Sequence, residues 1–143
     1  MKRVILFGAL LLIVLTGVIS CNSSKKASAG KPLEETSWQL TKAGDITYAP
    51  PAGVRKVYIK LSKDNKITGF LGCNNLIGSY KTGTGDQLSF MAASTRMFCQ
   101  GDAMKYEDGL NKALTATRRY KIEGDKLSLM TDDGTWLADF KPM

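Results

Sequence analysis

Two cysteines in the globular part of the chain have the greatest potential for chemistry. Cys73 lies in the stretch GCNNLIGSY, residues 72–80, and Cys99 ends the stretch STRMFC, residues 94–99. Such a pair can supply a nucleophile, two ligands of a metal ion or a disulfide bond. Which of these applies depends on the other side chains available and on the compartment in which the protein folds.

Most familiar catalytic combinations are absent from the sequence. It contains no histidine, which excludes Ser-His-Asp triads, Cys-His pairs and the histidine ligands of zinc sites. The two cysteines also lack the short Cys-x-x-Cys spacing of zinc sites. The acidic pairs are Glu107 with Asp108 and Asp132 with Asp133. We expect both to be solvated, because adjacent residues do not converge on one substrate. The sequence therefore predicts no metal, no cofactor and no enzymatic activity.

The first 20 residues, MKRVILFGALLLIVLTGVIS, have the layout of a secretory signal peptide. Lys2 and Arg3 precede a long aliphatic run that ends in small residues. The run from Val4 to Ile19 is nearly long enough to span a membrane, so a retained anchor helix is the alternative. Removal of this segment lowers the formal net charge of +7 by two.

The junction Val18-Ile19-Ser20-Cys21 is similar to a bacterial lipobox. This similarity implies that Cys21 receives diacylglycerol through a thioether and that the chain is cleaved after Ser20. Two or three acyl chains make such an attachment durable. The lipobox therefore predicts a lipoprotein anchored in the bacterial cell envelope. The presence of Asn22 instead of an aspartate favours the outer membrane, facing the periplasm.

Residues 21–36 are predicted to form a lipidated, flexible tether. The stretch NSSKKASAGKPLEE, residues 22–35, contains a single large apolar residue, which is too little to offset the entropy of ordering. Lys25, Lys26 and Lys31 either contact anionic headgroups or are simply solvated. The remaining charges are mixed in sign and lack the basic and aromatic pattern of a nucleic-acid surface. The predicted partners are the membrane and an envelope protein or lipid, and not nucleic acid.

Residues 37–143 are predicted to form one α+β domain that is mainly antiparallel β. Short alternating segments between turn signals indicate strands, as in Arg55 to Ser62 and in the closing segments RYKIEG, KLSLMT and TWLADF. One helix begins near Asp102, its predicted N-cap. Its apolar face is formed by Met104, Leu110, Ala113, Leu114 and Thr117. Gly109 inside this helix indicates close packing. We expect a curved sheet or cracked barrel with this helix packed on it.

An exported protein folds in an oxidising compartment, which favours a disulfide between Cys73 and Cys99. They are the only thiols left once Cys21 is acylated. The bond would close a loop of about 25 residues and contribute about 3.5 kcal/mol in the chain-entropy model. A redox-active pair of cysteines is the alternative.

Several segments of the chain, in this order and spacing, resemble the META domain, also called the HslJ-like domain or DUF306. The likeness runs from Trp38-x-Leu40 through GCNNLIGSY, MAASTRMFC (91–99) and RYKIEGDKLSLMTDDG (119–134) to Leu137–Phe140. It implies a small exported bacterial domain, often part of a lipoprotein and associated with envelope stress or heat shock. It also implies a cracked antiparallel barrel with a helix, similar to a lipid-binding secretin pilot lipoprotein, and no established reaction.

The predicted function is that of a non-enzymatic envelope lipoprotein, a binding or assembly module in envelope maintenance or stress tolerance. Alternatives are a carrier of a small apolar ligand or lipid in the cracked barrel and an inhibitor of a hydrolase. The candidate binding residues beside the disulfide are Asn74, Asn75, Ser94, Thr95 and Arg96. A purely structural role is the other interpretation, because asparagine side chains close turns and an arginine can pair with a carboxylate.

Overall fold

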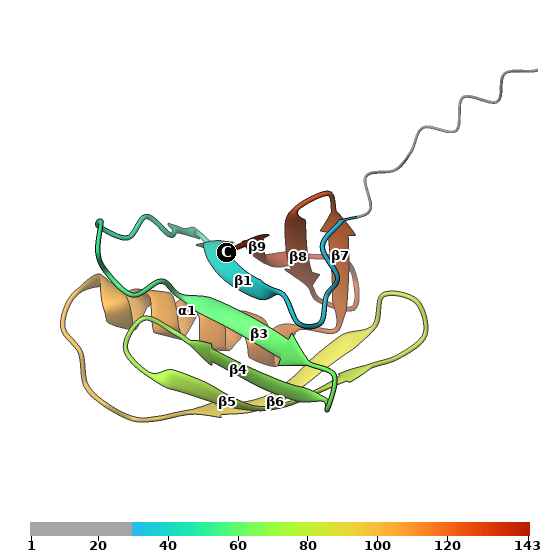
Figure 1. Cartoon of the computed structure of the whole chain (residues 1–143), viewed down its shortest axis with the longest axis horizontal. Coiled ribbons are helices and arrows are strands. Elements are labelled where there is room, and N and C mark those ends of the chain that lie inside the picture. Colours follow the sequence, from blue (N-terminus) through green and yellow to red (C-terminus); the bar gives the residue numbers. More distant parts are fainter. Residues whose placement is uncertain (1–29) are drawn as a thin grey trace, which may run out of the picture.

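A computed structural model describes residues 30–143, which form one curled sheet and a helix (Figure 1). The predicted signal peptide and Cys21 lie outside the described residues. The elements are β1 (Ser37–Ala43), β2 (Ile46–Thr47), β3 (Tyr58–Ser62), β4 (Lys66–Phe70), β5 (Asn75–Thr82), β6 (Leu88–Ser94), α1 (Asp102–Ala116), β7 (Arg119–Glu123), β8 (Lys126–Met130) and β9 (Trp136–Pro142). No helix within this range is long and apolar enough to cross a membrane.

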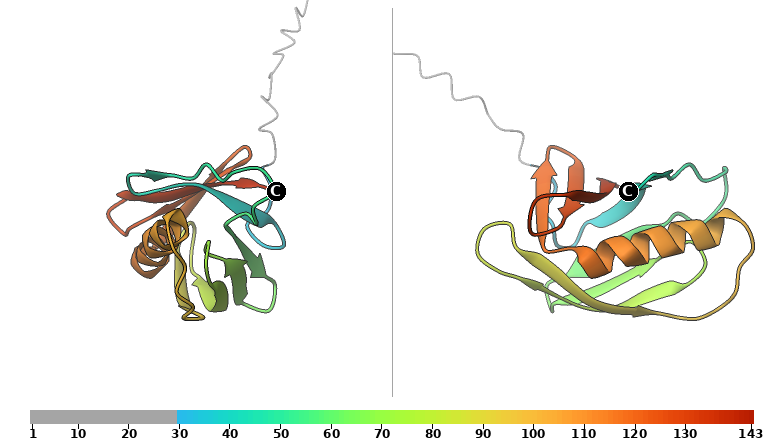
Figure 2. Two further views of the ribbon diagram at one scale, coloured as in Figure 1. Left: turned by 90° about the vertical axis from the view of Figure 1, so that its left-hand side faces the viewer. Right: turned by 180° about the vertical axis from the view of Figure 1, so that it is seen from behind.

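The strands are antiparallel throughout, in the order β6-β5-β4-β3-β1-β9-β8-β7, and the short β2 pairs with β1. The sheet curls into a half-barrel, and α1 lies across the opening between its two ends (Figure 2). The helix contacts β6 on one side and β1, β8 and β9 on the other. The predicted fold class, a mainly antiparallel cracked barrel with one packed helix, is confirmed.

The two ends of the sheet meet only where β6 and β7 begin. The Leu88 N–H donates to the Arg118 carbonyl at 2.9 Å, and the Tyr120 N–H donates to the Asp86 carbonyl at 2.9 Å. The Arg119 guanidinium lies 2.8 Å from the Asp86 carboxylate, and its hydrogen bond lowers the pKa of Asp86. Beyond this point β6 and β7 diverge, and the helix fills the space between them.

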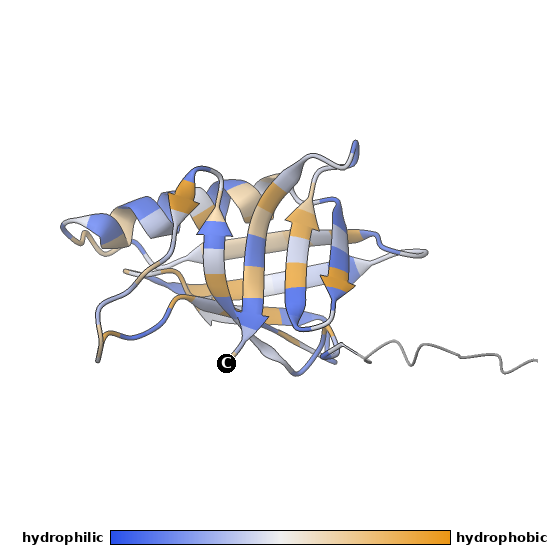
Figure 3. Ribbon diagram, turned by 90° about the horizontal axis from the view of Figure 1, so that it is seen from above, coloured by the Kyte–Doolittle hydropathy of each residue, from blue (hydrophilic) through white to orange (hydrophobic). Residues whose placement is uncertain are grey.

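Hydrophobic and hydrophilic residues alternate along several strands, as the bands of colour in Figure 3 show, and successive side chains of a strand point to opposite faces of the sheet. Trp38, Tyr80 and Phe140 are at most 1% exposed and fill the interior together with aliphatic residues. The predicted close packing at Gly109 is confirmed, because a Cβ there would lie 3.2 Å from Cδ1 of Ile46.

The helix differs from the prediction at its start. Asp102 is the first helical residue and not the cap; Gly101 precedes it with a φ of 76°, and no side chain caps the helix. The expected apolar face is buried at Leu110, Ala113, Leu114 and Thr117, whereas Met104 is only partly buried. A glycine tolerates this positive φ, so the chain can turn sharply from the preceding loop into the helix.

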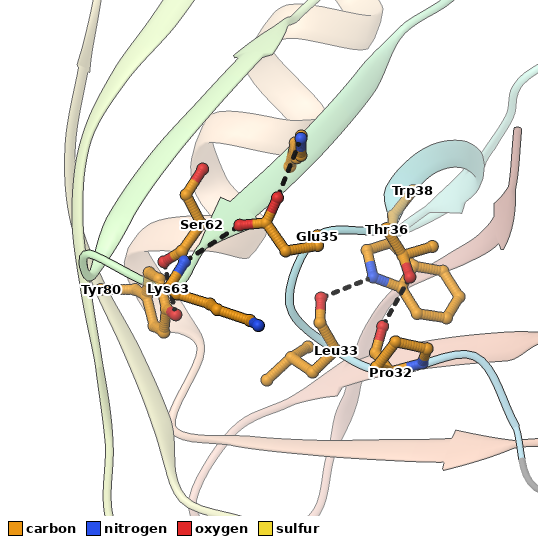
Figure 4. Close-up of polar contacts among 9 residues, drawn as sticks. Pro32, Leu33, Glu35, Thr36, Trp38, Ser62, Lys63 and Tyr80 are labelled. Atoms are coloured by element: carbon orange, nitrogen blue, oxygen red, sulfur yellow. Dashed lines mark hydrogen bonds and ion pairs between the residues drawn. The ribbon is translucent and has the colours of Figure 1, made fainter.

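Residues 32–36, placed in the tether by their composition, are packed against one end of the barrel (Figure 4). The Trp38 indole donates to the Leu33 carbonyl at 3.0 Å, and the Glu35 N–H donates to the Leu61 carbonyl at 2.7 Å. The Tyr80 hydroxyl lies 2.6 Å from the Glu34 carboxylate. Burial, together with this bond, raises the pKa of Tyr80 above its usual range. Leu61 and Tyr80 lie far from this segment in the sequence, so composition alone does not reveal the packing.

The sheet, its helix and their shared core lie entirely within residues 30–143. A protein that comprises residues 22–143 therefore includes all residues of the described fold.

The substitution Gly69→Ala should destabilise the domain, because a Cβ at this position would lie 2.2 Å from the Tyr58 carbonyl oxygen, a backbone atom that cannot move freely. We expect the free energy of unfolding to fall by about 1–3 kcal/mol. Thr68→Ala, at the exposed neighbouring position, serves as the control and should change it by less than about 0.5 kcal/mol. Urea unfolding of both variants measures the difference, and equal stabilities would contradict the predicted clash.

Candidate binding site

The candidate residues lie where two connections of the chain are joined by a disulfide. Cys73 is in the β4–β5 connection, and Cys99 is in the loop between β6 and α1; their sulfurs are bonded, with the Cα atoms 5.8 Å apart. The disulfide prediction is therefore confirmed. The bond holds residues 95–101 against the β4–β5 connection.

Asn74, next to the disulfide, is 2% exposed and uses its whole amide group in hydrogen bonds. Its Oδ1 accepts from the Met97 N–H and from the Thr95 hydroxyl, both at 2.7 Å. Its Nδ2 donates to the Met97 carbonyl and to the Glu107 carboxylate, each at 3.0 Å. One side chain thus fixes the loop after β6 to the first half of α1.

Glu107 is the most important residue that sequence reasoning misplaced. It is 5% exposed, so the expectation that it is solvated is wrong, although its neighbour Asp108 is exposed as predicted. Its carboxylate accepts from the backbone N–H of Asn74 at 3.0 Å and lies 3.4 Å from the Ser94 hydroxyl. These bonds offset the cost of burying a charged group. The sequence does contain an indication of this burial, since Glu107 lies three residues before Leu110 and therefore on the buried face of the helix.

Asn75 connects this network to a further arginine. Its backbone N–H donates to the Thr95 hydroxyl at 3.2 Å, and its Oδ1 accepts from Arg55 at 3.1 Å. The Arg55 guanidinium lies 4.1 Å from the centre of the Phe70 ring, a cation–π contact. Sequence reasoning missed Arg55, because residue 55 is 20 positions away from Asn75 and no motif connects them.

The structure therefore brings Asn74, Asn75, Ser94 and Thr95 together, and gives each a hydrogen bond within the domain. Arg96 follows directly but is exposed and makes no hydrogen bond or ion pair with any residue from 30 to 143. Within the same residues, no three side chains of His, Cys, Asp or Glu gather as metal ligands. The first four residues hold the site together, whereas the Arg96 side chain is exposed.

The loop that these bonds hold presents two large apolar side chains to solvent. Met97 is 63% exposed and Phe98 is 83% exposed, although Cys99 and Asn74 fix the backbone on either side of them. Single exposed apolar side chains are common on protein surfaces, whereas adjacent large ones form an apolar patch. Their exposure on a covalently fixed loop marks a candidate interaction surface.

Three connections gather at this end of the domain: residues 48–57, 71–74 and 95–101. Figures 1 and 2 place them together, opposite the end where residues 30–36 pack; we call this the distal end. A cleft of about 260 Å³ runs between the first two connections and the start of α1. Its wall includes Tyr48 and Tyr106, whose rings pack edge to face with their centroids 4.8 Å apart. Its rim includes Val54, which is 53% exposed.

The substitution Asn74→Ala should release the loop, because it removes the side-chain partner of the Met97 N–H and carbonyl and one donor of the Glu107 carboxylate. We expect a loss of about 2–4 kcal/mol in the free energy of unfolding. The exposed Asn75→Ala serves as the control and should cost about 1 kcal/mol or less. Hydrogen exchange at the Met97 amide provides a local measurement: exchange should be faster in Asn74→Ala and unchanged in Asn75→Ala. Slow exchange in both would contradict the assigned role of Asn74.

Removal of the disulfide should destabilise the domain mainly through the unfolded state, since the bond connects residues 26 positions apart. We expect the double variant Cys73→Ala/Cys99→Ala to lose about 3.5 kcal/mol. Urea unfolding with and without a reductant measures this loss. The native protein should lose stability on reduction and the double variant should not. Equal stability of the oxidised and reduced protein would contradict the prediction.

A family model described as the META domain matches residues 31–142. The solved structures that resemble this domain include an NMR structure of a protein from Burkholderia xenovorans, at 29% identity and a TM-score of 0.61, covering 78% of this chain and 83% of the other. A crystal structure of a DUF4847 family protein from Bacteroides vulgatus ATCC 8482, at 13% identity and a TM-score of 0.53, covers 81% of this chain and 94% of the other. No curated protein matches the chain.

The match starts at Lys31, so it includes the packed segment 32–36 as well as the sheet and the helix. The resemblance noted in the sequence is therefore confirmed, and the chain belongs to the META domain family.

Proposed function

We propose that this META-domain protein is a non-enzymatic lipoprotein of the bacterial cell envelope. In this proposal Cys21 anchors it in the outer membrane, facing the periplasm, and the domain acts as a binding or assembly module in envelope maintenance or stress tolerance. The lipobox supports the anchor, and the absence of histidine from the sequence supports a role other than catalysis.

The observation that carries the binding role is the fixed exposure of Met97 and Phe98. The disulfide and the Asn74 amide hold their loop in one conformation. Binding through such a loop loses little conformational entropy, because the loop is already ordered. Phenylalanine, methionine and arginine are also enriched in interface cores, and Arg96 precedes these two residues.

A carrier that encloses a ligand inside the barrel is less consistent with the packing. Trp38, Tyr80 and Phe140 fill the interior and are almost inaccessible to solvent. A lipocalin-like ligand would have to displace them. We therefore prefer a function carried by the surface of the distal end over one carried by the interior.

Photo-crosslinking in cells tests the proposed function. A photoreactive amino acid at position 98 should form adducts with a defined envelope component, because this side chain is the most exposed of the apolar surface. Thr84, exposed in the hairpin between β5 and β6, is the matched control position and should not form these adducts. The variant Cys21→Ala should leave the membrane fraction and lose the adducts. Identical adducts from positions 98 and 84, or none from position 98 under normal and stress conditions, would contradict the proposal.

A further inference from the structure

We propose that the distal end is a second membrane contact, one that binds an anionic lipid bilayer. The inference rests on the proposed function in one respect, because both assign binding to the loop that carries Met97 and Phe98. It goes further in naming the partner: the surface of a bilayer rich in anionic headgroups.

The exposed apolar side chains of this end lie on two separate connections. Val54 is on one connection, and Met97 and Phe98 are on another. They protrude from separate loops and do not line one groove. A protein partner would need a matching shape for each of them, whereas the apolar part of a bilayer accepts any protruding hydrocarbon or aromatic group.

The charges of the same connections complement an anionic surface. Residues 48–57, 71–74 and 95–101 contain Arg55, Lys56 and Arg96 but no aspartate or glutamate. All three cations are exposed and lack an ion pair with any described residue. Each basic residue close to an anionic bilayer adds to the attraction.

Of the carboxylates next to these connections, two are paired or buried, and Asp45, in the turn between β1 and β2, is exposed without an ion pair to any described residue. Asp102, on the rim of the cleft, pairs with Lys105 at 3.0 Å, and Glu107 is buried against Asn74. At the opposite end of the domain, by contrast, Glu35, Asp64, Asp86 and Glu123 each pair with a lysine or arginine, so charges of both signs are mixed there. The distal end differs in that its cations are unpaired, which favours its contact with anionic lipid.

Three backbone groups of the loop that carries Phe98 already have partners within the domain. In lipid, unpaired N–H and carbonyl groups are costly. The Met97 N–H and carbonyl both bond to the Asn74 amide, at 2.7 and 3.0 Å, and the Thr95 N–H bonds to the Asn75 carbonyl at 3.1 Å. Water is therefore not needed at these groups when the loop enters the headgroup region.

Binding to vesicles tests this inference without the lipid anchor. The segment from residue 22 to 143 lacks Cys21 and contains the complete described fold. It is mixed with sucrose-loaded vesicles of phosphatidylcholine alone, or of phosphatidylcholine and phosphatidylglycerol in equal amounts, and sedimented. We expect binding to the phosphatidylglycerol vesicles, weaker binding as salt is raised, and at least about tenfold weaker binding to phosphatidylcholine.

Two variants separate the apolar and the charged contributions. Met97→Ser/Phe98→Ser and Lys56→Gln/Arg96→Gln should each weaken binding by about tenfold or more. The control variant is Ile77→Ser/Met91→Ser. Its two side chains are 68% and 75% exposed on β5 and β6, so it removes similar apolar area elsewhere and should retain binding within about twofold. Circular dichroism and thermal unfolding confirm that each variant is folded.

The outcomes distinguish this inference from the proposed function. Failure to sediment with phosphatidylglycerol vesicles, or equal loss of binding in the Ile77/Met91 control, would overturn the membrane contact. If a protein adduct still formed at position 98 in cells, the proposed function would stand without it. Vesicle binding that depends on Met97 and Phe98, without any protein adduct in cells, would support the membrane contact and contradict a protein partner at this loop.

Discussion

The sheet of this domain curls but closes only at the start of β6 and β7, and this incomplete closure shapes the rest of the molecule. Two strand edges and part of the core would otherwise face water, so the chain places its helix between them. The β6–α1 connection must therefore reach from one edge strand to the helix that covers it. The loop with Met97 and Phe98 is this connection, and its position follows from the closure.

The helix brings a carboxylate into a place where water is excluded, and the neighbouring loops are organised around it. Glu107 needs donors, and the backbone and side chain of Asn74 supply them. The remaining hydrogen bonds of the Asn74 amide are made with the loop that follows β6. Removal of one partner from such a network leaves the others unsatisfied. The intact network is therefore more rigid than the number of its hydrogen bonds suggests. The adjacent disulfide fixes the same two connections covalently, so the exposed loop rests on two independent supports.

The fold was predictable because it depends on local patterns. Alternation along residues 119–140 and turn glycines such as Gly124 identify the strands directly, and Leu110 and Leu114 mark the buried face of the helix. The disulfide followed from the number of cysteines and the expected compartment. What failed were assignments that depend on remote partners. The composition of 32–36 suggests a tether, and only Trp38, Leu61 and Tyr80 reveal that it packs.

The candidate site, like the fold, could be predicted only where local sequence was sufficient. Its polar residues were found because they cluster around the two cysteines in sequence. Their roles were not, because a sequence does not show that Asn74 faces Glu107, 33 positions away. Charged residues are assumed to be exposed, and this assumption fails where a specific donor compensates for burial. Arg55 was missed for the same reason, since its contacts with Asn75 and Phe70 exist only in the folded sheet.

The packed segment 32–36 also determines how a mechanical load would enter the domain. It leads directly into β1, which lies between β3 and β9 in the middle of the sheet. Tension applied through residue 30 would first act on the bonds of Leu33, Glu34 and Glu35, and then on β1. Because β1 is antiparallel to both neighbours, a pull along its axis would shear two rows of hydrogen bonds at once instead of opening one row bond by bond. A load that entered the domain at residue 30 would thus act on a strand that is paired on both sides.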